Sequence, residues 1–236
     1  DAVHWLDRGL VGGQLVDGRL ALHGDLAHWP FHDRSGRMIA RGEIDNLTLN
    51  YDPEWPRAEK VHAIATFIND GMQVDVDSGE SMGVKVNQAS ATIADFGPLI
   101  LYLDAKAEGS GANLLGFLRA TPIGKRYQDQ LKDISVGGRG KVGFALHLPI
   151  KQIETLTLDG TAQLSDAKLD HNAYNLHFLN ADGPLRFNQK GFAADQLDVS
   201  FRDRKAKLSI AIGNYVSDPK NVFEATLQGQ FPAATV

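Results

Sequence analysis

Apolar and polar residues alternate along most of this 236-residue chain, a pattern typical of β-strands that bury one face and expose the other. The pattern is clearest at residues 99–105, 142–148 and 208–212, where every second side chain is apolar. Further strands are expected at residues 18–26, 38–51, 61–68, 72–76, 84–93, 156–164, 176–178, 185–187, 197–201 and 223–227. Together these segments predict about twelve to fourteen strands, joined by short turns into an antiparallel meander.

The alternation changes phase inside two of these strands. Within residues 38–51, the apolar parity shifts between Ile44 and Leu47, close to Asn46. A second shift lies between Val86 and Ala89. An extra residue in a β-bulge would return the apolar side chains to one face, so a bulge is predicted near Asn46.

Helical periodicity is confined to two segments. Residues 1–11 predict a short amphipathic helix that ends at Gly12-Gly13. Residues 112–131 predict a helical segment that is interrupted at Thr121-Pro122. Among the turns, residues 69–71 predict a hairpin, and the acidic run 75–80 is interpreted as a polar hairpin turn.

The helices are too few to cover the predicted sheet. They comprise roughly 30 residues, whereas each strand presents an apolar face that needs cover. The sheet must therefore cover itself, as a sandwich, a barrel or a curled groove. The interpretation adopted is a mainly β fold: an extended antiparallel meander curled into an apolar groove of the β-taco, repeating-β-groove type, with two short helical segments.

The chain also resembles itself at an offset of 120 positions. Without a gap, residues 46–72 lie over residues 166–192, in the order strand, polar loop, strand, Asn/Gln-x-Gly turn, strand. Identity is low, so the order of features carries this prediction of an internal repeat. The expected organisation is a first repeat at 1–109, a helical insertion at 110–133 and a second, continuous repeat at 134–236.

Composition excludes several classes of function. The net charge is −5 with acidic and basic residues intermixed, so no basic patch predicts nucleic-acid binding. The chain has no cysteine, which excludes disulfides and thiolate chemistry. No apolar run reaches the roughly 18 residues of a membrane span. The chain is interpreted as an internal piece of a longer protein.

No motif predicts catalysis, a metal or a cofactor. His28 and His32 are separated by Pro30, which precludes a regular helix that would bring them to one face. The acidic run starting at Asp75 lacks the glycine and glutamate that a calcium loop needs at its sixth and twelfth positions. The glycine-rich residues 137–141 lack P-loop spacing. The chain is therefore predicted not to be an enzyme and to carry no cofactor.

The order of short motifs in the first hundred residues resembles a known family. These motifs are Trp5-Leu6, Gly18-Arg19-Leu20, Gly24-Asp25-Leu26, Trp29-Pro30-Phe31, Leu49-x-Tyr51, Trp55-Pro56, Gly71-Met72, Gly83 and Ala94-Asp95. In this order they resemble the YhdP branch of the AsmA-like proteins of Gram-negative bacteria, as far as about Thr121-Pro122. Residues 160–212 are similar to the looser AsmA-type repeat.

The resemblance implies a segment of a periplasmic, inner-membrane-anchored lipid-transfer protein of outer-membrane biogenesis. Its apolar groove would conduct phospholipid from the inner to the outer membrane. The implied partners are phospholipid acyl chains and neighbouring segments of the same longer chain. Contact with a membrane would be made through the full-length protein only, and no nucleic acid would bind. The side chains predicted to line the groove are Leu20, Leu22, Ile44, Leu47, Leu49, Ala63, Ala65, Phe67, Met72, Val74, Val84, Val86, Leu101, Leu103, Val142, Phe144, Leu146, Leu156, Leu158, Phe187, Leu197, Val199, Leu208 and Ile210.

Two alternatives remain open from the residues alone. The apolar rows could be an ordinary dry core, which the alternation by itself favours. The chain could also be a non-enzymatic β-scaffold that binds protein partners or envelope components through loops and edge strands. Trp29, Phe31, Tyr51 and Trp55 would then be contact residues, or they could simply plug the end of the sheet. The helical segments could cap a groove or pack along its opening.

Overall fold

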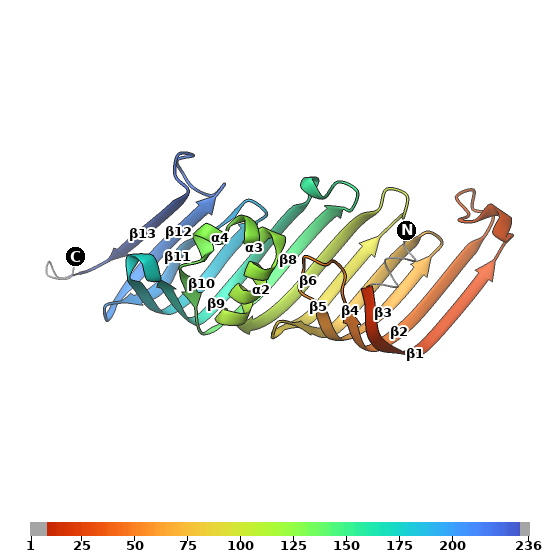
Figure 1. Cartoon of the computed structure of the whole chain (residues 1–236), viewed down its shortest axis with the longest axis horizontal. Helices are drawn as coiled ribbons and strands as arrows, with labels where there is room; N and C mark the ends of the chain where they lie inside the picture. The colour runs from red at the N-terminus through yellow and green to blue at the C-terminus, as the bar shows by residue number, and fades with distance from the viewer. Residues whose placement is uncertain (1–8, 232–236) are drawn as a thin grey trace. The chain divides into compact units, whose positions relative to one another are not determined.

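The described part of the chain, residues 9–231 of a computed structural model, is mainly β-sheet (Figure 1). Its strands are β1 (Leu10–His23), β2 (Arg37–Leu49), β3 (Ala58–Ile68), β4 (Gly71–Ser81), β5 (Val84–Ile93), β6 (Ile100–Ser110), β7 (Ile134–Val136), β8 (Arg139–Pro149), β9 (Thr157–His171), β10 (Leu176–Asn188), β11 (Gly191–Phe201), β12 (Arg204–Gly213) and β13 (Phe223–Gly229). The helices are α2 (Gly111–Ala120), α3 (Pro122–Arg126) and α4 (Gln128–Leu131), with 3₁₀ turns η1 (Leu26–His28), η2 (Ile153–Thr155) and η3 (Asn172–Tyr174).

The strands form one hydrogen-bonded, 13-stranded sheet that is not closed. Its order is β1-β2-β3-β4-β5-β6-β8-β9-β10-β11-β12-β13, with the short β7 paired to β9. Apart from β7, strands that follow one another in the chain are neighbours in the sheet. The pairings from β1 to β4 and from β9 to β13 are antiparallel. The antiparallel meander and the expected number of strands are confirmed.

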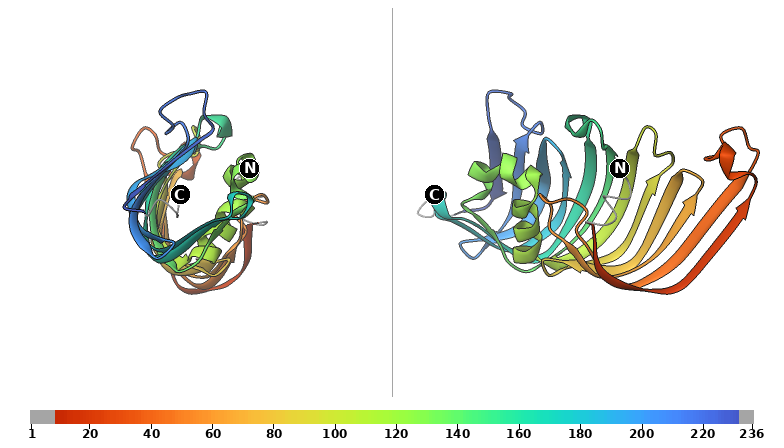
Figure 2. Two further views of the ribbon diagram at one scale, coloured as in Figure 1. Left: turned by 90° about the vertical axis from the view of Figure 1, so that its left-hand side faces the viewer. Right: turned by 45° about the vertical axis from the view of Figure 1, so that its right-hand side comes forward.

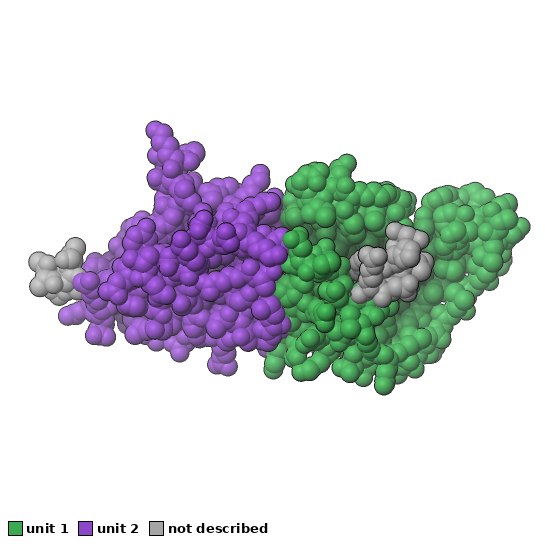
Figure 3. All heavy atoms as spheres, in the orientation of Figure 1, with its two compact units in different colours: residues 1–81, 85–106, 145–157 green, residues 82–84, 107–144, 158–236 purple. Residues whose placement is uncertain are grey.

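Within this sheet the described residues form two compact units (Figure 3). Unit 1 contains residues 9–81, 85–106 and 145–157, and unit 2 contains residues 82–84, 107–144 and 158–231. Each unit is considered separately below.

In unit 1, a row of irregular positions crosses β1, β2 and β3. Asn46 and Lys60 have left-handed backbone conformations, with φ of 48° and 51°, and Gly13 has φ of 141°. The β2–β3 register shifts between Ile44 and Leu47, where Asn46 is the bulged residue. A bulge bends a strand and raises its local twist, and Figure 2 (right) shows β1 and β2 strongly curved along their length. The bulge predicted near Asn46 is confirmed.

Unit 2 has a corresponding row. Asp166, Asn180 and Gln196 have φ of 47°, 50° and 60° on β9, β10 and β11. Side chains join these positions, because Asn180 Nδ2 donates to Asp166 Oδ1 at 2.8 Å. The backbone N–H of Asp166 in turn donates to Asp182 Oδ1 at 3.0 Å. Hydrogen bonds thus connect the bulges on β9 and β10.

The two triplets β2–β3–β4 and β9–β10–β11 have the same strand register. Ile44 pairs with Ala63 in unit 1, and Leu164 pairs with Gly183 in unit 2, so both partners are displaced by 120 positions. The same displacement holds at the far end of the triplets, where His62 pairs with Ser78 and Asp182 with Asp198. It also holds for the turns that follow, since residues 82–83 and 202–203 all have positive φ. The two triplets therefore correspond at the offset of 120 positions, and the organisation into repeats at 1–109 and 134–236 stays a prediction.

The helical segment follows β6, and polar side chains cap its first two helices. Ser110 Oγ accepts a hydrogen bond from the Asn113 N–H at 3.1 Å and begins α2. Thr121, which is 2% exposed, separates α2 from α3: its hydroxyl donates to the Leu118 carbonyl at 2.7 Å and accepts from the Gly124 N–H at 3.2 Å. The predicted interruption at Thr121-Pro122 is confirmed.

Several local predictions were wrong. Gly12 and Gly13 lie inside β1 instead of ending a helix, because the bulge there uses glycine to continue the strand. Residues 1–8 of that predicted helix lie outside the described residues. The strand expected at 18–26 ends at His23, with Leu26 in η1. The acidic run 75–80 is mid-strand in β4, and its hairpin turn comes later, at Met82-Gly83.

No helix among residues 9–231 combines the length and the apolar character needed to cross a membrane.

Candidate functional site

In unit 1, the side chains predicted to line the groove lie on one face of the sheet. Directly paired residues of antiparallel strands share a face. Leu20 pairs with Ala40, which pairs with Phe67, which pairs with Met72. The alternation and the bulge at Asn46 place the other members on the same face: Leu22, Ile44, Leu47, Leu49, Ala63, Ala65 and Val74.

Most large side chains on this face keep contact with solvent. Only Leu47, Val61 and Ala63 form a buried cluster, and two of the fully covered positions are alanines, Ala63 at 0% and Ala65 at 8% exposure. Leu20 is 69% and Leu22 45% exposed on the edge strand β1. The remaining members are half-buried: Ile44, Leu49, Phe67, Met72 and Val74. Large apolar side chains in a dry core are usually buried completely, so this face is only partly covered by the described residues.

The corresponding face of unit 2 is buried more deeply. Leu197, Val199 and Leu208, at 1%, 4% and 2% exposure, pack in one cluster. Phe187 and Ile210 border the same face half-buried, and Leu158 is 8% exposed. In this conformation the clustered side chains have almost no free surface, so their assignment to lipid stays a prediction that requires unit 2 to open.

Strands β5, β6 and β8 carry the remaining predicted residues. Leu101 and Leu103 alternate on β6, and Val142, Phe144 and Leu146 alternate on β8 in the parity of the buried Gly140, all five half-buried. Val84 is 5% exposed and Val86 is half-buried on β5. Leu156 is the exception, because it follows η2 as its C-cap and precedes β9.

Helix α2 lies against the sheet of unit 2 at two glycines. A Cβ built on Gly140 would lie 2.9 Å from Leu114 Cδ1 and 3.8 Å from Leu164 Cδ2, and a Cβ on Gly109 would lie 3.7 Å from Leu114 Cγ. Leu164 belongs to the buried cluster of the apolar face. Leu114 therefore sits on the apolar face, and the missing side chains at the two glycines leave the space it uses. Figures 1 and 2 show the helical segment on one side of the strands of unit 2.

Sequence reasoning missed Leu15, which belongs to the unit 1 face. Leu15 pairs with Ile44 on β2, is 67% exposed, and lies over Gly18 and Gly42. It was missed because residues 12–13 were interpreted as the end of a helix. Reading Gly12-Gly13 as a bulge would have extended the strand to include it.

The opposite face of unit 1 carries a cluster of charged side chains around His62. His62 lies among three carboxylates, with its ring nitrogens 3.8 Å from Glu43, 3.5 Å from Asp45 and 3.9 Å from Asp77. These distances are those of loose ion pairs on a solvated strand surface, which contribute little to stability. Across residues 9–231, no group of histidine and acidic side chains is arranged to hold a metal ion.

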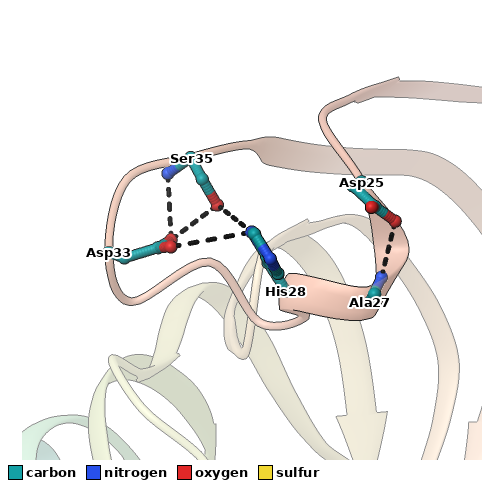
Figure 4. Close-up of polar contacts among 5 residues, drawn as sticks. All are labelled: Asp25, Ala27, His28, Asp33 and Ser35. Carbon is teal, nitrogen blue, oxygen red and sulfur yellow. Dashed lines mark hydrogen bonds and ion pairs between the residues drawn. The ribbon is translucent and has the colours of Figure 1, made fainter.

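The loop between β1 and β2 is ordered by short polar contacts (Figure 4). Asp25 Oδ1 accepts from the Ala27 N–H at 2.9 Å. Asp33 Oδ1 accepts from both the hydroxyl and the N–H of Ser35, at 2.6 and 3.0 Å. The hydroxyl hydrogen bond, followed by the backbone one, lowers the pKa of the Asp33 carboxyl below its usual value. His28 Nδ1 lies 3.3 Å from Ser35 Oγ and completes the cluster.

The four aromatic candidates have different environments. Phe31 is 2% exposed and packs in the β1–β2 loop against Gly24 and Gly36, so it plugs the loop. Trp29 contacts it edge-on at 5.9 Å between ring centroids but remains 43% exposed. Tyr51 and Trp55 contact each other at 6.4 Å. Burial, with a smaller effect of Asp52, raises the pKa of Tyr51 to about 12.

The sequence was compared with protein families and with known proteins. The model of the YhdP family matches residues 1–236. The intermembrane phospholipid transporter YhdP of Escherichia coli (strain K12) is 22% identical over 201 residues, which cover 85% of this chain and 16% of that protein. The chain therefore spans about one sixth of this relative. No solved structure matches. Because the family model covers the whole sequence, the chain belongs to the YhdP family.

Proposed function

We propose that this chain is a segment of a phospholipid transporter and that the apolar face of unit 1 contacts the acyl chains. The single observation that carries the proposal is the partial exposure of that face. Leu15, Leu20 and Leu22 are 67%, 69% and 45% exposed on β1, and the neighbouring strands add half-buried side chains in the same rows. Exposed apolar surface of this kind marks a binding surface in a soluble domain.

The chemistry suits a lipid tail. Each methylene moved from water onto this face contributes about 0.8 kcal/mol, so a tail of ordinary length gains enough to remain bound. The opposite face carries Glu43, His62 and Asp77 in water. A lipid held on the apolar face can keep its charged headgroup beyond the rim of the sheet, where the headgroup retains its hydration.

The name of the relative supports the class of cargo, since the E. coli protein is called an intermembrane phospholipid transporter. Its name describes transport and no chemical conversion, in keeping with the prediction that the chain is not an enzyme. We further propose a curled groove within each unit, a periplasmic location in an inner-membrane-anchored protein, and transport from the inner to the outer membrane. The groove would be built from the repeats expected at 1–109 and 134–236.

Neighbouring segments of the longer protein are the proposed partners at the sheet edges. Every residue of β1 is exposed, and β1 stands at one end of the strand order. An edge strand with an apolar face is a template for a further strand. The alternative is a β-scaffold that binds envelope partners through its loops. Of its four aromatic candidates, only Trp29 is exposed and favours this role.

Lipid extraction tests the proposal. The purified chain is extracted with organic solvent and its phospholipid measured by mass spectrometry. Leu101→Asp is compared with Tyr102→Asp: the two residues are neighbours on β6, and Tyr102 points to the opposite face, where its ring lies 4.9 Å from that of His147. We expect Leu101→Asp to lose lipid while it still folds, and Tyr102→Asp to retain lipid.

Two outcomes would contradict the proposal. The first is an absence of phospholipid from the unmodified chain. The second is unfolding of Leu101→Asp, seen as loss of the cooperative thermal transition, since this would identify the row as ordinary core.

A further inference from the structure

We propose that helix α2 is a lid, seated where an acyl chain would otherwise lie on the apolar face of unit 2. This inference rests on the proposed function and extends it, because it assigns a role to the helical segment. The first observation is the position of Leu114, which lies against Gly109 and Gly140 on the apolar face and beside Leu164 of the buried cluster. An apolar side chain of the protein thus occupies surface that a lipid tail would use.

Glycine at position 140 leaves the space that the Leu114 side chain occupies. A Cβ on Gly140 would lie 2.9 Å from Leu114 Cδ1, closer than side-chain atoms approach without displacement. A side chain at this position would displace the Cδ1 end of Leu114. Gly140 is nevertheless buried, so Leu114 and its neighbours supply the cover that its own side chain cannot.

Few polar contacts hold the N-terminal part of α2 in place. Asn113 Nδ2 donates to the Gly83 carbonyl at 3.0 Å, and the Gly111 N–H donates to the Gly138 carbonyl at 3.0 Å. Beyond Gly111, no side chain of α2 is fully buried. Leu115, Phe117 and Leu118 are half-buried, so the helix can leave the sheet without exposing a complete core.

The far end of the segment is anchored more firmly. The Arg119 guanidinium donates to the carbonyls of Leu131 and, at 2.7 Å, Ile134. Leu131 is 4% exposed, and β7 then pairs with β9. Glycines flank the segment on both sides, with Gly138 at φ of 73°. The segment is therefore built to stay folded as a unit while its contact with the face changes.

A cross-link tests the lid directly, because the chain contains no cysteine that could interfere. Leu114→Cys and Gly140→Cys are combined and oxidised, and the phospholipid bound by the oxidised and the reduced protein is compared. The single variant Leu114→Cys, given the same oxidant, is the control. We expect the disulfide to form, and the oxidised protein to bind less lipid than the reduced one. Failure to oxidise would contradict the seat of Leu114, and equal loading of both forms would overturn the lid.

A second variant gives a result of opposite sign. Leu114→Ser weakens the closed state, so we expect lipid loading to rise by on the order of several-fold. Leu176→Ser removes the same apolar volume from β10, where Leu176 packs against the buried cluster, and should not raise loading. If Leu114→Ser lowers loading or leaves it unchanged, α2 is a fixed part of the core. If no form of the chain binds lipid, the proposed function fails together with the lid; lipid that binds regardless of the cross-link overturns only the lid.

Discussion

Asn69 and Gln189, 120 positions apart, make the same hydrogen bond to the backbone. Asn69 Oδ1 accepts from the Met38 N–H at 2.9 Å, and Gln189 Oε1 accepts from the Leu158 N–H at 3.1 Å. The two donors are themselves 120 positions apart. In each unit, a side chain in a hairpin turn therefore accepts a hydrogen bond from the strand that precedes the hairpin, which is β2 for Asn69 and β9 for Gln189. This contact helps to fix the register between that strand and the hairpin.

The hydrogen bond accepted by Gln189 predicts that removal of its acceptor destabilises the protein even when the length of the side chain is kept. Gln189→Met preserves the length of the side chain and removes the strong acceptor, which leaves the Leu158 N–H without this partner. We expect the free energy of unfolding to fall by about 1–2 kcal/mol. Urea denaturation provides the measurement. Gln189→Glu retains an acceptor and should lose less; equal losses in the two variants would show that the hydrogen bond is unimportant.

The bulge at Asn46 predicts a preference for residues that tolerate a left-handed backbone. Asn46 has φ of 48°, a conformation that a β-branched residue adopts poorly. Asn46→Val should therefore destabilise the protein by about 1–2 kcal/mol. Asn46→Gly, which adopts this φ freely, should remain within about 0.5 kcal/mol of the unmodified chain. Similar stabilities for the valine and glycine variants in urea would contradict the role of the bulge.

Two glycine-to-alanine substitutions are expected to have opposite effects. Gly116 is in the middle of α2, and a Cβ there meets no atom within 4 Å. Gly116→Ala should stabilise the protein by about 0.5–1 kcal/mol, because alanine loses less backbone entropy in a helix. At Gly191 a Cβ would collide with the Ile212 carbonyl oxygen of the paired strand. Gly191→Ala should cost more than about 2 kcal/mol, since backbone must move. Thermal unfolding of both variants checks the signs.

Glu224 predicts acid sensitivity in the loop between β12 and β13. Its carboxylate accepts from the N–H groups of Ser217 and Asp218, at 2.9 and 3.0 Å, and then from the Asn221 amide and the Ser217 hydroxyl. These hydrogen bonds lower the pKa of Glu224 from 4.5 to about 2. A lowered pKa means that the carboxylate orders the loop above pH 4.5, and that this contribution disappears as the pH falls toward about 2.

An NMR titration checks the Glu224 prediction. The amide signals of Ser217 and Asp218 should shift with a midpoint near the low pKa. Glu224→Gln, which cannot titrate, should abolish the shift. A midpoint at the ordinary glutamate value would mean that the four hydrogen bonds do not hold the carboxylate in solution.

The sequence alone was sufficient for the local features that depend on alternation. Residues 84–93 were predicted as a strand with the bounds that β5 has. The bulge near Asn46 was predicted because a period-2 pattern must slip by one residue to keep Ile44 and Leu47 on one face. The offset of 120 residues was visible in the sequence, and Asn46 and Asp166, which correspond at that offset, both adopt a left-handed backbone.

Predictions from the alternation of apolar and polar residues were wrong where backbone conformation and strand pairing determined the structure. Gly12 and Gly13 carry no face preference, so a strand through a bulge and the end of a helix have the same local signature. The acidic residues 75–80 were assigned to a turn because of their polarity, yet they form the solvated half of β4. Composition cannot separate a polar turn from the polar face of a strand without the pairing partner.

Only the tertiary structure decided how much of each apolar face is covered. The rows of Leu20 and Leu208 have the same pattern in the sequence, but one side chain is 69% and the other 2% exposed. A strand's sequence specifies which side chains share a face through the period of its own backbone. What covers that face depends on whether the strand lies at the edge of the sheet, on the bending that successive bulges produce, and on helix α2, which follows β6 and packs against the face of unit 2. All three depend on residues distant in the sequence.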